Sequence, residues 1–140
     1  MYIKQKYKYD CGVAGVYNLL KSVNIDFDYL DLKKELNTTT LWGTIPKNID
    51  NFLINNGYYN LDFKISLVLV SSDKFYSSNE EDYGHYINII NICNNIYKVF
   101  DPWDGRYYYI EKSKLINMTL NVLVGPKFRY NKVKYLNIEF

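Results

Sequence analysis

A chain of 140 residues that is 48% hydrophobic is long enough for one domain with a packed core, which excludes wholesale disorder. The net charge of +2 is too small to indicate a nucleic-acid-binding protein. The sequence has no apolar run near the roughly 20 residues of a membrane helix, and its N-terminus lacks the apolar stretch of a signal peptide. We therefore expect a cytoplasmic protein without a membrane segment.

The first part of the chain shows helical patterns. Apolar residues recur at helical spacing over residues 11–22, and Asp10 precedes them as a suitable N-cap. A shorter helix is expected over residues 29–36. A third is announced by Thr44 and Pro46 and ends before Gly57.

The second part shows strand patterns. Asn94-Asn95 separates two apolar stretches, and this pair tolerates the positive φ of a tight hairpin. Asp104-Gly105 is a second turn signal, and a short helix is expected over residues 111–115. The expected strands cover residues 63–70, 86–93, 96–100, 106–110, 119–124 and 132–140.

Helices followed by strands indicate an α+β fold with segregated layers. We expect a single domain over residues 1–140, with a mainly helical part at 1–57 and a mainly antiparallel sheet at 58–140. The sequence shows no internal repeat or linker.

Cys11 is the first candidate functional residue, because it opens the first expected helix. The free amides and positive dipole end of a helix N-terminus favour a thiolate over a thiol. Gly12, directly after it, leaves room for a substrate backbone. An oxyanion formed by attack on an amide carbonyl needs hydrogen-bond donors, and the backbone N–H of Cys11 and the side-chain amide of Gln5 are candidates.

His85 is the only histidine of the chain and begins an expected strand after Gly84. At that position its imidazole can pair with the thiolate and later protonate a leaving amine. Asp101 ends the neighbouring strand of the hairpin, so it is the best candidate to orient the imidazole. Pro102 then terminates the strand.

Each of these residues also has a purely structural interpretation. A cysteine at a helix start is often a small buried hydrophobic residue, and Asp101-Pro102 is an ordinary turn. Cys93 is expected in the core, and Tyr86, Trp42 and Trp103 are expected to pack, although Trp103 is placed to shield His85 and Asp101. Two distant cysteines and one histidine fit no zinc pattern, so we expect no metal or other cofactor.

Three segments together resemble the papain-like cysteine peptidases, most closely the C39 and C39-like group. Residues 5–14 read Gln-x-x-x-x-Asp-Cys-Gly-x-Ala, Gly84-His85-Tyr86 precedes alternating apolar residues, and Phe100-Asp101-Pro102 forms a corner. This group includes the leader-peptide-cleaving domains attached to bacteriocin-exporting ABC transporters. The resemblance covers roughly residues 1–125, and residues 126–140 extend beyond it.

The resemblance implies a papain-like fold, with the site in a cleft between a helical subdomain and an antiparallel sheet. It implies Cys11 as nucleophile, His85 as general base and acid, Asp101 as orienting residue and Gln5 as oxyanion donor. The implied partner is a peptide or protein substrate, and Gly12, Gly84 and Trp103 are candidate substrate contacts.

These site residues do not specify which reaction the protein catalyses. The same acyl-enzyme would serve a hydrolase, a deamidase or an acyl transferase, and the fold could also serve as a non-catalytic peptide-binding module. The polar, acidic loop at residues 71–83, with Glu80 and Glu81, is expected to overhang the cleft and to favour basic or polar substrates.

Overall fold

The computed structural model describes residues 1–77 and 83–126. Its first part contains α1 (Cys11–Lys21), α2 (Tyr29–Glu35) and α3 (Pro46–Asn55), which confirms the predicted helices to within one or two residues at their ends. Asp10 occupies the N-cap position of α1, but its side chain makes no capping hydrogen bond. Its carboxylate instead interacts with Lys33 and Tyr29 of α2.

The second part contains a five-stranded antiparallel sheet in the order β4-β3-β2-β1-β5. The predicted hairpin is confirmed, since Asn94 has a φ of 56° between β2 and β3. β1 begins three residues later than predicted, α5 extends further, the short helix α4 was not predicted, and the expected strand at 132–140 lies outside the described residues. The bounds are β1 (Ser66–Ser71), α4 (Ser72–Tyr76), β2 (Gly84–Cys93), β3 (Ile96–Asp101), β4 (Arg106–Glu111), α5 (Lys112–Met118) and β5 (Thr119–Val124).

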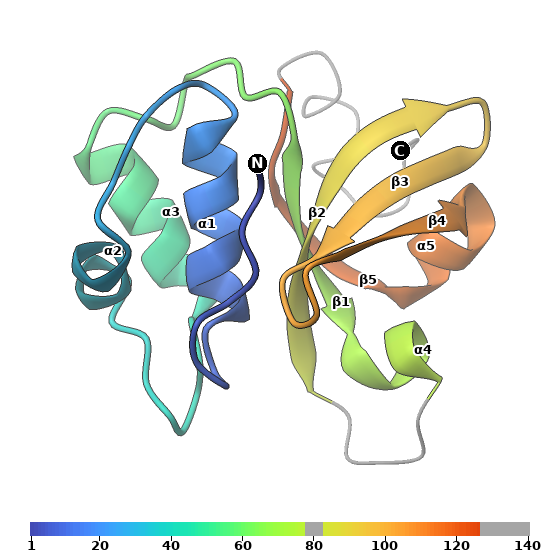
Figure 1. The fold of residues 1–140 in the computed structure, drawn as a ribbon, viewed down its shortest axis with the longest axis horizontal. Coiled ribbons are helices and arrows are strands. Elements are labelled where there is room, and N and C mark those ends of the chain that lie inside the picture. Colours follow the sequence, from blue (N-terminus) through green and yellow to red (C-terminus); the bar gives the residue numbers. More distant parts are fainter. Residues whose placement is uncertain (78–82, 127–140) are drawn as a thin grey trace.

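The sheet has a hydrophobic core on each face, so the layers are less segregated than expected. α1, α2 and α3 lie on one side, whereas α4 and α5 lie on the other (Figure 1). Alternation along β1 sends Leu67 into the first core and Val68 and Val70 into the second. Within the described parts of the chain, no helix has the length and apolar character needed to cross a membrane.

α1 packs closely against the sheet because two of its residues have no side chain. A Cβ at Gly12 would lie 2.6 Å from Cβ of Thr44 and 3.1 Å from the Tyr86 ring, and a Cβ at Gly15 would lie 2.6 Å from Leu67. The two distances of 2.6 Å are shorter than real side chains show, and the third is tight. The glycines therefore set the distance between the N-terminal half of α1 and the sheet.

A buried pair of asparagines joins α1 to the sheet. Nδ2 of Asn88 in β2 donates to the carbonyls of Gly15 (3.1 Å) and Ser66 (3.2 Å), and its Oδ1 accepts from Asn18 of α1 (3.3 Å). Asn18 also exchanges hydrogen bonds with the backbone of Ile3. The network ties α1, two strands and the N-terminal segment together in an interior where unpaired polar groups are costly.

We predict that Asn88→Ala lowers the free energy of unfolding by about 2–4 kcal/mol, because it removes two buried hydrogen bonds to carbonyls and the acceptor of one hydrogen of the Asn18 amide. Urea denaturation measures the change. Asn91→Ala is the matched control, since Asn91 is an exposed asparagine on the same strand. Equal stability of the two variants would contradict a role for Asn88 in joining helix and sheet.

Candidate active site

Cys11 is the first residue of α1 and is partly exposed. The first N–H groups of a helix have no intrahelical acceptor, so the Cys11 side chain lies among amides that favour an anion. The preceding loop reaches the helix through a short turn, in which the Asp10 N–H donates to the Tyr7 carbonyl (3.2 Å). The helix geometry thus places the thiol at an electropositive end, as the sequence predicted.

His85 and Asp101 form a buried pair on the sheet. His85 is the second residue of β2 and is 3% exposed, and Asp101 is the last residue of β3 and fully buried. Nε2 of His85 and Oδ1 of Asp101 are 2.7 Å apart. The antiparallel hairpin brings these residues together although 16 positions separate them.

The titration of the His85 imidazole is also affected by Cys11. Burial alone would lower the pKa of His85, but the hydrogen bonds to Asp101 and Cys11 and the charges of both groups raise it to about 9. At neutral pH His85 is therefore protonated. Because Nε2 serves Asp101, the remaining ring nitrogen, Nδ1, is the one available to Cys11.

The Asp101 carboxylate is held by several donors. Oδ1 also accepts the backbone N–H of Trp103 (3.0 Å), and Oδ2 accepts the hydroxyl of Tyr76 (2.7 Å). The next carbonyl, that of Pro102, accepts the N–H of Gln5 (2.8 Å). This last bond connects the corner after β3 to the loop that precedes Cys11.

Gln5 is buried beside this corner, but its side-chain amide is already engaged. Its Nε2 donates to the carbonyls of Tyr7 (2.8 Å) and Lys8 (2.9 Å), so both hydrogens hold the loop before Cys11. The two carbonyl neighbours fix which end of the amide carries the nitrogen. For Gln5 to donate to an oxyanion, one of these two hydrogen bonds must open.

Asp10 is fully buried next to Cys11, and its carboxylate supports the same loop from the α2 side. Oδ1 pairs with Nζ of Lys33 (3.0 Å), and Oδ2 accepts the hydroxyl of Tyr29 (3.2 Å). The ammonium of Lys33 also lies 4.5 Å from the centre of the Tyr7 ring. Instead of capping α1, Asp10 anchors the loop before Cys11 to α2.

The candidate substrate contacts are placed differently from one another. The space beside Gly12 is filled by Thr44 and Tyr86, so the missing side chain serves internal packing rather than leaving room for a substrate. Gly84 is exposed and abuts Leu69. Trp103 is 50% exposed, which contradicts a purely packing role, while its backbone N–H serves Asp101.

Three further sequence expectations can be compared with the structure. Cys93 is exposed at the end of β2, so the prediction of a core thiol was wrong. Trp42 is 73% exposed, so it does not pack as expected, whereas Tyr86 is buried as expected and donates to the Thr44 carbonyl (2.7 Å). Glu80 and Glu81 lie outside the described residues.

Sequence reasoning missed Tyr76. Its hydroxyl lies 3.0 Å from Nε2 of His85 as well as 2.7 Å from Asp101. The sequence contains 16 tyrosines and no motif surrounds this one, so no pattern singled it out. Only the position of α4 beside β2 brings it to the site.

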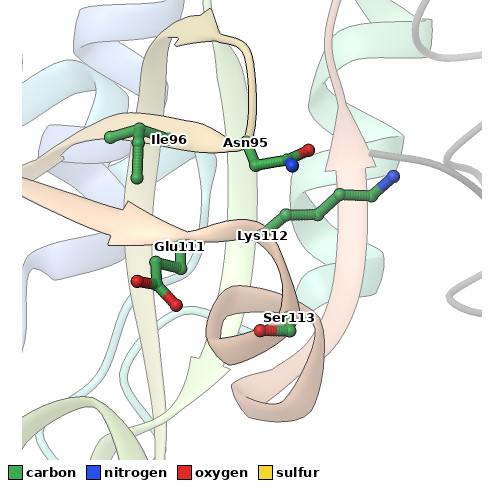
Figure 2. A pocket seen from close by; sticks show the side chains of 5 residues that line it. All are labelled: Asn95, Ile96, Glu111, Lys112 and Ser113. Atoms are coloured by element: carbon green, nitrogen blue, oxygen red, sulfur yellow. The ribbon is translucent and has the colours of Figure 1, made fainter.

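Among residues 1–77 and 83–126, no group of three or more His, Cys, Asp or Glu side chains could hold a metal ion. A hollow of about 400 Å³ is lined by residues of the β2–β3 turn and the start of α5, shown in Figure 2. It includes Asn95 and Ile96, at the opposite end of β3 from Asp101. The hollow is therefore separate from the Cys11 site.

The sequence matches no protein-family model and no curated protein. Among solved structures, the fold is similar to that of a double-glycine motif protease from an AMS/PCAT transporter, determined in complex with the leader peptide. The TM-score is 0.60 at 12% sequence identity, and the match covers 87% of this chain and 86% of that chain. The chain therefore shares nearly its whole α+β fold with a protease.

We predict a pH-dependent stability that depends on His85. Its pKa of about 9 lies above the ordinary value of 6.5, so protonation stabilises the folded state fully below about pH 6.5 and ceases to do so as the pH rises through 9. The loss should be on the order of 3 kcal/mol. Urea denaturation of the wild type and of His85→Gln at pH 6, 7.5 and 9.5 measures it. The two proteins should converge at high pH, and a constant difference between them would contradict the prediction.

Proposed function

We propose that this protein is a C39-like cysteine peptidase with a papain-like arrangement, in which Cys11 is the nucleophile. The observation that carries the proposal is the His85 imidazole, which is 2.7 Å from the buried Asp101 carboxylate and near enough to Cys11 that both groups raise its pKa, to about 9. The similarity in fold to a double-glycine motif protease supports it.

In the proposed mechanism Cys11 attacks as a thiolate, and the protonated imidazole of His85, with its pKa raised to about 9, is its partner. The thiolate of Cys11 attacks a peptide carbonyl carbon, forming a C–S bond and an oxyanion. As the oxyanion collapses, the C–N bond breaks and His85 gives its proton to the leaving amine. A water then attacks the thioester carbon while neutral His85 removes its proton, the C–S bond breaks with its electrons returning to sulfur, and the carboxylic acid leaves the restored pair.

The backbone N–H of Cys11 is the first oxyanion donor in this proposal. It belongs to the free amides at the start of α1 and sits on the nucleophile itself. Gln5 supplies the second donor by exchanging its bond to the Tyr7 or Lys8 carbonyl for a bond to the oxyanion. The exchange costs little, because one hydrogen bond replaces another.

The proposed substrate is a peptide or protein chain. The similar protease was solved with the leader peptide bound, which supports a peptide ligand for the shared fold. In this proposal, residues 1–57 supply the nucleophile, residues 58–140 supply the histidine and aspartate, and the two parts form one catalytic domain. The catalytic steps need no metal or cofactor.

We predict that iodoacetamide alkylates Cys11 rapidly at pH 6, where an ordinary thiol is less than about 1% ionised. The exposed Cys93 provides the matched control. The rapid phase should persist in Cys93→Ser, disappear in Cys11→Ser and slow at least about tenfold in His85→Gln. Mass spectrometry locates the label. Equal rates at both cysteines in the wild type would refute an activated Cys11.

We also predict cleavage of peptides. A synthetic peptide library incubated with the wild type should yield shorter products, and Cys11→Ala should form them at least about a thousandfold more slowly. Mass spectrometry separates the alternatives, because deamidation adds one dalton to an intact chain whereas hydrolysis divides it. Either an unchanged library or the one-dalton gain alone would contradict a peptidase.

A further inference from the structure

Tyr76 reaches the His85–Asp101 pair from α4, outside the three segments that resemble known peptidases. Its hydroxyl lies 2.7 Å from Oδ2 of Asp101 and 3.0 Å from Nε2 of His85. Its ring packs on the imidazole, with centroids 5.4 Å apart, and edge-on against Phe75 at 4.9 Å. One side chain therefore contacts both members of the pair.

The direction of each hydrogen bond follows from the chemistry of the groups. A carboxylate only accepts, so the phenolic proton of Tyr76 goes to Oδ2 of Asp101. The phenol oxygen then presents a lone pair to Nε2 of His85, whose other close neighbour is Oδ1 of Asp101. Burial and the Asp101 hydrogen bond raise the pKa of Tyr76, so its hydroxyl remains a neutral donor.

The proton on Nε2 thus lies between two acceptors, Oδ1 of Asp101 and the phenol oxygen. This arrangement opposes rotation of the imidazole and keeps the Nε2 proton in place, which leaves Nδ1 as the nitrogen available to Cys11. The Asp101 carboxylate in turn keeps one orientation, because each of its oxygens has its own donors.

We propose that Tyr76 is a positioning residue of the active site, which holds His85 and Asp101 in the geometry that activates Cys11. The proposal rests on the proposed function, since it assigns a role in forming the thiolate–imidazolium pair. Tyr76 acts through His85 and Asp101 and does not contact the substrate carbonyl in the chemical steps.

Tyr108 supplies a matched control. Its hydroxyl donates to Asp104, a carboxylate three residues beyond Asp101, and its ring lies 5.9 Å from that of Phe75. Tyr108→Phe therefore removes a similar tyrosine–aspartate hydrogen bond from the same neighbourhood without touching His85. Any effect seen in Tyr76→Phe but not in Tyr108→Phe belongs to the contact with the His85–Asp101 pair.

The test combines two readouts that need no known substrate. Because the chain has a single histidine, its ¹⁵N-labelled imidazole gives one set of NMR signals. In the wild type the Nε2 proton should exchange slowly with water, and in Tyr76→Phe it should exchange about tenfold faster, as expected for the loss of a hydrogen bond to a charged group. Alkylation of Cys11 by iodoacetamide at pH 6 should slow by about the same factor.

Tyr76→Leu removes the hydroxyl together with the aromatic ring, and it should show the same faster proton exchange and slower alkylation. Tyr108→Phe should show neither effect. Wild-type exchange and wild-type alkylation in both Tyr76 variants would overturn the proposal. If Cys11 of the wild type is not rapidly alkylated, the proposed function fails, but the exchange of the Nε2 proton still decides whether Tyr76 holds the pair.

Discussion

The close approach of α1 to the sheet is the constraint on which the candidate site depends. Cys11 lies on the helix and His85 on a strand, so their contact exists only if the helix end lies against β2. Gly12 and Gly15 allow that distance, and the Asn88 side chain fixes it by a hydrogen bond to the Gly15 carbonyl. A larger side chain on that face of α1 would move the sulfur away from the imidazole.

Once the helix and the sheet are in place, electrostatic interactions decide the protonation state of His85. Burial by itself disfavours a charged imidazole, and the opposing effect of Asp101 and Cys11 prevails, since the pKa of His85 is raised to about 9. The carboxylate that makes this possible is buried with donors on both oxygens. Two backbone bonds keep the corner in place: the Gln5 N–H donates to Pro102, and the Gly105 N–H donates to the Asp101 carbonyl.

Much of the local structure could be predicted from the sequence because its signals are local. The helices of the first part, the hairpin at Asn94 and the last described strand follow from apolar spacing and turn residues. The exposure of Cys93 and Trp42 could not be predicted, because burial depends on which elements cover a residue in space. α4 was missed because five residues carry too little periodicity to distinguish a helix from a loop.

The sequence by itself determined that a cysteine opens a helix, that the only histidine begins a strand, and that an aspartate ends the partner strand of the hairpin. Those positions follow from apolar spacing and turn residues, which are properties of short stretches of sequence. Only the tertiary structure decided that Asp10 pairs with Lys33 instead of capping α1, that Gln5 gives both hydrogens to its own loop, and that Tyr76 joins His85 and Asp101. Hydrogen bonds between distant residues form according to where packing brings donors and acceptors together, and no single stretch of sequence records that.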